Sequence, residues 1–141
     1  MAATNYFLHL CQQTLAFLVY LWPMTLFFVF PLLISIVQAY YQKKKKIAVH
    51  LVLGMTGFIF SLLLLAWGSI NRHQGQDLRA IGFQASLIGT GIFIGQILYG
   101  AFLVTKVPGY RFLVGTMVAL QSWVSFYAFM VASMAVTGDW F

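Results

Sequence analysis

Four long apolar runs constrain the fold of this chain more than any other feature of its sequence. Short polar connections separate the runs, which cover about residues 14–37, 47–70, 80–104 and 112–137. Each run exceeds the roughly 20 residues that a helix needs to cross the hydrocarbon core of a bilayer. We predict helices, because backbone inside lipid must satisfy its own hydrogen bonds and the runs lack the short alternating segments of a membrane barrel.

The composition agrees with a chain embedded in lipid. Of its 141 residues, 62% are hydrophobic and only 7% are charged, whereas soluble domains carry about 25% charged residues. Such a chain cannot cover itself with a water-facing surface, which excludes a soluble enzyme, a disordered region and a disulfide scaffold. Because short connections make sequential helices antiparallel, we predict an all-α fold: an integral membrane up-down four-helix bundle that forms a single transmembrane domain over residues 1–141.

Basic residues predict the orientation in the membrane. The net charge is +6, and the first and third connections hold six of the eight basic residues. The positive-inside rule then predicts both termini on the outer side, periplasmic or lumenal, with Trp67 and Trp140 near the outer interface. Half of the basic residues form one run, which we expect to contact anionic lipid headgroups: Lys43, Lys44, Lys45 and Lys46. A basic groove with interleaved aromatic residues is absent, so nucleic acid is not an expected partner.

The first apolar run contains two prolines, Pro23 and Pro31. Each removes one backbone donor, so we predict a bent helix over residues 14–37. The bends either curve this helix around its neighbours or form a hinge or ligand site. The start of the chain is not expected to be a secretory signal, because it lacks a basic first region and a small-residue cleavage site and its apolar run is too long. We expect residues 4–13 to form an interfacial turn of helix that leads into this span.

Small residues recur at helical spacing and predict where the helices contact one another. Close packing of such residues, with a few hydrogen bonds, is what holds helices together in lipid. The third run carries small residues on two opposite faces, including the GxxxG pair Gly91 and Gly95. We predict that this helix is central, or that it holds one neighbour from this chain and one from a partner chain. The predicted packing positions are Gly54, Gly57, Ser61, Gly82, Ser86, Gly89, Gly91, Gly95, Gly100, Ala128 and Ala132.

Two glutamines are predicted to meet inside the membrane. Gln96 lies about eight residues above the inner end of its helix, roughly 12 Å, and Gln121 lies about nine residues above the inner end of the next helix, roughly 13.5 Å. We predict a side-chain hydrogen bond between them, or a shared water, worth about 0.6 to 2 kcal/mol. The alternative is a contact with a quinone or pigment.

Catalytic chemistry is poorly represented in the sequence. Glutamate is absent, and the two acids, Asp77 and Asp139, lie outside the predicted spans. Proton-driven transporters usually need a titratable group in the membrane, so that class is disfavoured. No paired carboxylates, metal cluster or nucleophilic triad can be assembled, so we predict neither an independent enzyme nor a metal site. The polar outer connection with Arg72 and His73 is either a solvated turn or a site for a quinone headgroup, a lipid phosphate or a partner subunit.

His50 is expected about one turn inside the second helix, on its small-residue face. We expect it to hydrogen-bond a backbone carbonyl or a lipid headgroup; the alternative is a single axial ligand to haem or chlorophyll. A bis-histidine haem is disfavoured because His50 has no second histidine at its depth. Aromatic side chains of the first and fourth runs are expected to face acyl chains or, alternatively, a carotenoid or chlorophyll. They include Phe27, Phe28, Phe30, Trp123, Phe126, Tyr127 and Phe129.

The order of these features resembles a known group of membrane proteins. A basic first connection precedes His50 and Gly54, His73 follows the second run, and Val136-Thr137-Gly138 closes the last one. Over residues 43–138 this layout resembles small four-helix families of the haem-b type and related oxidase-assembly proteins. The resemblance implies His50 as a candidate ligand of haem b. It also implies that other haem sites are lost, because the third and fourth runs contain no histidine, where such families place haem ligands.

Three functions are compatible with the sequence. The first is a small accessory or structural subunit of a larger energy-converting membrane complex, respiratory or photosynthetic, with lipids and other membrane subunits as partners. The second is a protein that itself binds haem, quinone or pigment in electron transfer or assembly. The third is a small channel or transporter, whose path only a few polar residues are available to line: Thr90, Gln96, Gln121 and Ser125.

Overall fold

A computed structural model of the chain describes residues 3–42, 47–71 and 78–138, with side chains over residues 5–42, 47–71 and 87–138. These residues form helices and contain no strand. The elements are α1 (Ala3–Tyr20), α2 (Trp22–Tyr41), α3 (Ile47–Met55), α4 (Phe58–Ile70), α5 (Leu78–Lys106), the 3₁₀ helix η1 (Pro108–Tyr110) and α6 (Arg111–Thr137). Four segments are long and apolar enough to cross a membrane: α2, α3 with α4, the Leu87–Lys106 part of α5, and η1 with α6. The predicted all-α membrane bundle is therefore confirmed.

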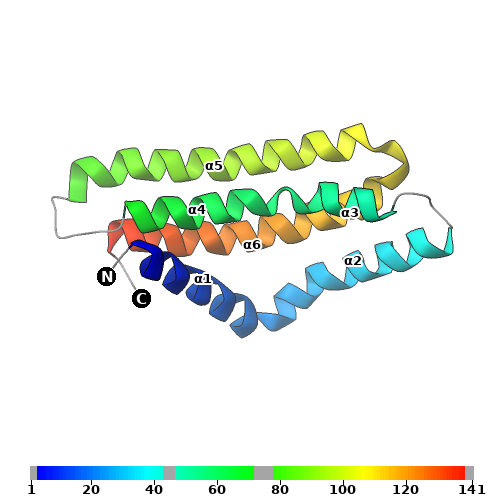
Figure 1. Ribbon diagram of the computed structural model, residues 1–141, viewed down its shortest axis with the longest axis horizontal. Coiled ribbons are helices and arrows are strands. Elements are labelled where there is room, and N and C mark those ends of the chain that lie inside the picture. The colour runs from blue at the N-terminus through cyan, green and yellow to red at the C-terminus, as the bar shows by residue number, and fades with distance from the viewer. Residues whose placement is uncertain (1–2, 43–46, 72–77, 139–141) are drawn as a thin grey trace.

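The helices follow an up-down course. The α3–α4 pair, α5 and α6 run side by side along the molecule, whereas α1 and α2 meet at an open angle (Figure 1). The start of α1 and the ends of α4 and α6 lie at one end of the molecule. The end of α2 and the turn between α5 and α6 lie at the opposite end, where the described basic residues Lys106 and Arg111 stand.

The first apolar run forms two helices instead of the single bent helix that we expected. α1 ends at Tyr20 and α2 begins at Trp22, so the helix breaks at Leu21. Pro23 therefore lies in the first turn of α2, where a missing backbone donor costs little because it has no partner within the helix. Pro31 is the proline that lies inside a helix.

The side chain of Thr25 adds hydrogen bonds at this first break. The hydroxyl of Thr25 donates to the carbonyl oxygens of Leu18 and Leu21, at 3.0 and 3.3 Å. The same hydroxyl accepts a hydrogen bond of 3.3 Å from the indole N–H of Trp123 on α6. The break is thereby attached to the helix that it packs against.

Residues 4–13 pack into the bundle rather than forming a separate turn ahead of it. They are the first half of α1, which contacts both α4 and α6. Leu10 is fully buried in a cluster that contains Leu64 and Val131, and the buried hydroxyl of Thr14 donates to the Leu10 carbonyl at 2.9 Å. Residues 4–13 therefore belong to the packed bundle, whereas the part of the first run that is long and apolar enough to span a membrane is α2.

The second run breaks as well, between α3 and α4 at Thr56 and Gly57. The backbone N–H of Thr56 donates three residues back, to the Leu53 carbonyl at 3.3 Å, which is the 3₁₀ pattern. The Thr56 hydroxyl donates to that carbonyl at 2.7 Å and shares a 2.7 Å hydrogen bond with the hydroxyl of Tyr99. The amide of Gln121 lies where a side chain at Gly57 would stand. Residues 47–70 thus form one candidate membrane span, as expected. The break within this span was not predicted from the sequence.

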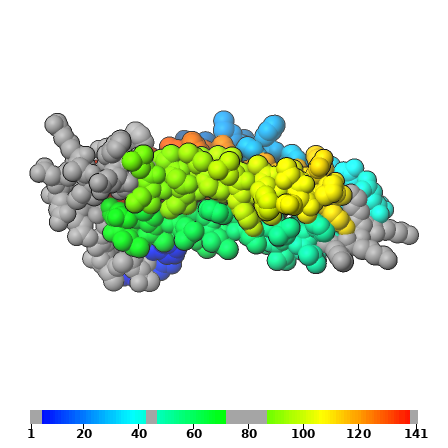
Figure 2. Space-filling model, turned by 90° about the horizontal axis from the view of Figure 1, so that it is seen from above, coloured from blue at the N-terminus to red at the C-terminus, as the bar shows by residue number. Residues whose placement is uncertain are grey.

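α6 is the central helix and contacts all five other α-helices. Small residues make these approaches short: Ser125, Ala128 and Ala132 are all 0% exposed. α5 packs on α4 and α6, and no other described helix covers its opposite face (Figure 2). The first of our two alternatives for the third membrane helix, a central position, is corrected, because α6 takes that position among the described helices. The second alternative, a neighbour from a partner chain, stays a prediction.

Candidate functional site

Most of the predicted packing positions that the structure describes lie inside the bundle. The buried ones are Gly54, Gly57, Ser61, Gly89, Gly100, Ala128 and Ala132. A Cβ added at Gly89 would lie 2.8 Å from the ring of Trp67. Trp67, which we expected at the outer interface, is therefore an inward-facing residue that is 7% exposed, because its ring fills the space that this glycine leaves open.

The glycine pair on the other face of α5 is not packed in this way. Gly91 is exposed, and a Cβ built there would meet nothing within 4 Å. A Cβ at Gly95 would reach only the ring of Phe60, at 3.9 Å. Gly91 therefore faces away from the described helices of this chain, whereas the half-buried Gly95 lies at the edge of the contact with α4.

A polar layer crosses the middle of the bundle, and we define it as Ser61, Gln96, Gln121 and Ser125. The hydroxyls of Ser61 on α4 and Ser125 on α6 share a hydrogen bond of 2.5 Å. Gln121 lies one turn from Ser125, and Gln96 lies on the α5 face that also carries the buried Gly89. Both glutamines are 2% exposed, so the polar layer is enclosed by α4, α5 and α6.

The predicted hydrogen bond between Gln96 and Gln121 is not formed. Neither amide atom of Gln96, nor the amide nitrogen of Gln121, has a hydrogen-bond partner, although all three atoms are buried. The Gln121 amide instead lies against Gly57, because the glycine leaves room there. The shared water stays a prediction. Amides and hydroxyls can hold water or a neutral hydrogen-bonding solute, but they supply no group that titrates near neutral pH.

His50 packs against an aromatic ring. Its half-buried ring is stacked on Tyr110, with ring centroids 3.7 Å apart and an interplanar angle of 13°, so the stack joins α3 to η1. Within residues 5–42, 47–71 and 87–138, no three His, Cys, Asp or Glu side chains could together hold a metal ion. Axial ligation by His50 stays a prediction, which a loss of visible absorption in His50→Ala would test.

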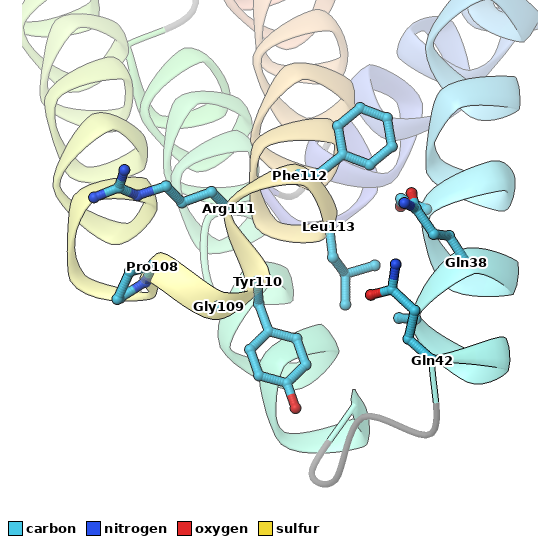
Figure 3. Close-up of a pocket in the computed structure, with 10 residues that line it drawn as sticks. Gln38, Gln42, Pro108, Gly109, Tyr110, Arg111, Phe112 and Leu113 are labelled. Carbon is cyan, nitrogen blue, oxygen red and sulfur yellow. The ribbon is translucent and has the colours of Figure 1, made fainter.

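A pocket of about 230 Å³ lies beside this stack, between the last turns of α2 and the start of α6. Ser35, Gln38, Ala39 and Gln42 line one side, and residues 108–113 line the other. Figure 3 shows the amides of Gln38 and Gln42 directed from α2 towards the start of α6, on the side of Leu113. Sequence reasoning missed this pocket, although two glutamines four residues apart at the end of an apolar run were a visible signal.

The expected aromatic clusters of the first and fourth runs partly face each other. Phe28 and Trp123 are stacked with centroids 5.0 Å apart, and Trp123 meets Tyr127 edge to face at 4.8 Å. A shallow apolar hollow of about 390 Å³ lies beside this stack. By contrast, Phe27 and Phe30 are 74% and 58% exposed, as expected of side chains that face acyl chains or a pigment.

Some predicted site residues lie outside the described part of the chain. These are Lys43, Lys44, Lys45, Lys46, Arg72 and His73. Gly82 and Ser86 belong to α5, but their surroundings are outside it as well. Comparison with family models, with curated proteins and with solved structures finds no match for this chain.

Proposed function

We propose that this chain is a small accessory subunit that packs, through the outer face of α5, against a transmembrane helix of another protein in a larger membrane complex. The observation that carries this proposal is the glycine pair on this face: Gly91 is exposed with nothing within 4 Å of an added Cβ, and the half-buried Gly95 would meet only Phe60. That the complex is respiratory or photosynthetic stays a prediction from the sequence.

The two faces of α5 support the proposal by contrast. On the inner face, Trp67 fills the space beside Gly89, and Val118 fills the space beside Gly100. By contrast, a Cβ at Gly91 would meet nothing within 4 Å. A glycine inside a helix is about 1 kcal/mol less favourable than alanine, so a face that contacts only lipid gains nothing from two glycines. Small residues four apart are the pattern that lets a second membrane helix approach closely.

Purification of the tagged protein in mild detergent tests this proposal. We expect native mass spectrometry to show a co-purifying membrane subunit with the wild type. The double substitution Gly91→Leu with Gly95→Leu should reduce its amount at least about tenfold, since bulky residues keep the helices apart. Ala16→Leu is the matched control, because Ala16 is an exposed small residue on α1 and should leave the partner bound. A wild-type chain that purifies only as a monomer or homodimer would contradict the proposal.

A small channel or transporter is the second candidate, and the polar layer favours it. Buried amides without partners are costly inside a membrane protein, so a polar solute or water passing this level would satisfy Gln96 and Gln121. Flux of a neutral solute or water into liposomes that hold the purified protein tests this candidate. A rate equal to that of protein-free liposomes would exclude it.

For the orientation, we propose that the end with Lys106 and Arg111 faces the inner side, so that both termini lie outside. The positive-inside rule supports this, and the structure groups these two described cations at the end opposite the start of α1. Reporter fusions at each terminus test it, and an enzyme reporter that is active on the inner side at either terminus would overturn it.

A further inference from the structure

We propose that the pocket between α2 and the start of α6 binds the phosphate headgroup of an anionic phospholipid. The proposal is independent of the α5 face, because the pocket lies between other helices. It rests on the hydrogen-bond donors in the pocket, the charge at this end of the molecule and the apolar surface beside it.

The donors are the side-chain amides of Gln38 and Gln42. Gln38 lies in the last turn of α2 and Gln42 is the residue that caps this helix. Both amides are directed from α2 towards the start of α6 (Figure 3). No hydrogen bond joins either amide to another part of the chain that the structure describes. Each amide carries two N–H donors, so the pair can donate hydrogen bonds to the oxygen atoms of one phosphate group.

The floor of the pocket is already hydrogen-bonded and does not compete for these amides. The hydroxyl of Ser35 donates to the Leu32 carbonyl at 2.7 Å and shares a 3.1 Å hydrogen bond with the hydroxyl of Thr116 on α6. Ser35 is 2% exposed. Ser35 and Thr116 thus use their hydroxyls to join α2 to α6. The side-chain donors that are left for a ligand are the amides of Gln38 and Gln42.

The charge at this end of the molecule selects an anion. The described ranges contain Lys106 and Arg111 here and no acidic residue. The guanidinium of Arg111 points to the far side of the η1 turn from the glutamines (Figure 3). It therefore contributes a positive field rather than a direct ion pair, and the amides give the direct hydrogen bonds. Basic surroundings of this kind attract anionic lipids.

The surface beside the pocket selects a lipid rather than a free phosphate. The pocket lies at the end of the apolar span α2 and at the start of the apolar span η1–α6, which is the depth of a lipid headgroup. Phe112, which lines the pocket, is 55% exposed. Ile34 and Val37 on α2, which directly precede the lining residues Ser35 and Gln38, are 59% and 52% exposed. Acyl chains attached to a phosphate in the pocket would run along these side chains. Tyr40 and Tyr41, 74% and 79% exposed, are aromatic residues typical of this interface.

Native mass spectrometry of the detergent-purified full chain, titrated with phosphatidylglycerol, tests the proposal. We expect one phosphatidylglycerol to bind with preference over phosphatidylcholine. The double substitution Gln38→Leu with Gln42→Leu should weaken the first binding step at least about tenfold, because hydrogen bonds to a charged group are lost. It changes no charge, so diffuse attraction to the basic residues is unaltered. Gln12→Leu is the control, since Gln12 is also exposed but lies on α1.

A second variant separates binding from folding. Gln42→Glu keeps the shape of the side chain and places a negative charge at the pocket. It should weaken phosphatidylglycerol binding more than phosphatidylcholine binding, without changing helix content by circular dichroism. Unchanged phosphatidylglycerol affinity in both variants would overturn the proposal, as would equal binding of the two lipids. Inorganic phosphate that displaces the lipid at equal concentration would show that free phosphate, not a lipid, is the ligand.

Discussion

The two helix breaks within the apolar runs, at Leu21 and at residues 56–57, are formed by different residues. The first stands two residues before a proline, whereas the second contains no proline and is centred on a glycine. At both breaks a threonine hydroxyl bonds a nearby carbonyl, and a side chain of α6 completes the arrangement: Trp123 at the first and Gln121 at the second. The central helix therefore takes part in placing the breaks of its neighbours.

The two breaks differ most in burial. Tyr20 and Trp22, which flank the first break, are 81% and 61% exposed, whereas Gly57 is buried against α6. Tight packing makes buried positions sensitive to added volume. We therefore expect the second break to tolerate substitution poorly and the first to tolerate it well.

Gly57→Leu tests the sensitive side of this comparison and has the largest expected effect. A side chain at residue 57 would overlap the amide of Gln121, and overpacking of this kind costs about 3 kcal/mol. Thermal unfolding in detergent should show the loss. Adding Gln121→Ala should recover part of it by making room, while Gly91→Leu, the same change on the open face of α5, should be nearly neutral. A variant as stable as the wild type would mean that α6 does not hold this break.

The two threonines allow a matched test of the breaks themselves. Thr25→Val removes the partner of the Trp123 indole and of the Leu18 carbonyl, which should cost about 1.5 kcal/mol. Thr56→Val also removes the partner of the Tyr99 hydroxyl, but the Leu53 carbonyl keeps its backbone hydrogen bond. The change should therefore cost less, about 0.6 kcal/mol. Thermal unfolding of the two variants side by side checks this order, and a larger loss at Thr56 would reverse the comparison.

The breaks also show what the sequence could and could not predict. The four spans follow from apolar length, and the bounds of α5 and α6 lie within two residues of the predicted runs. Pro23 signalled a bend but not its position, because proline is tolerated in a first turn and the break falls before it. Gly57 was predicted as a packing position only, since the amide that fills its space comes from 64 residues further along the chain (121 − 57).

The site was less predictable than the fold for a similar reason. Helical spacing put Gln96 and Gln121 on facing surfaces at matching depth, and both are buried there. Periodicity carries no information on side-chain rotamers, so it could not tell that the Gln121 amide lies against a glycine instead. The pocket with Gln38 and Gln42 depends on how α2 approaches the start of α6, which no local pattern encodes.

Gln96→Leu sharpens the comparison on the polar layer next to the second break. Both amide atoms of Gln96 are buried without a partner, so the apolar substitution should stabilise the fold by about 1 kcal/mol. Thermal unfolding measures the change, with the exposed Gln12→Leu as a control that should be neutral. Destabilisation by Gln96→Leu alone would show that the amide is hydrogen-bonded, as the shared water predicts.

Pro23→Ala has the smallest expected effect and tests the tolerant side of the comparison. Because Pro23 lies in the first turn of α2, its missing N–H has no partner in the helix, and the change should alter stability by less than about 0.5 kcal/mol. Spin labels at the exposed positions Leu15 and Ile34, in a background with Cys11→Ala, report the angle between α1 and α2 by their separation. An unchanged separation is expected, because Thr25 and Trp123 hold the break. A separation that increases as the helices straighten would make proline, and not α6, the cause of the first break.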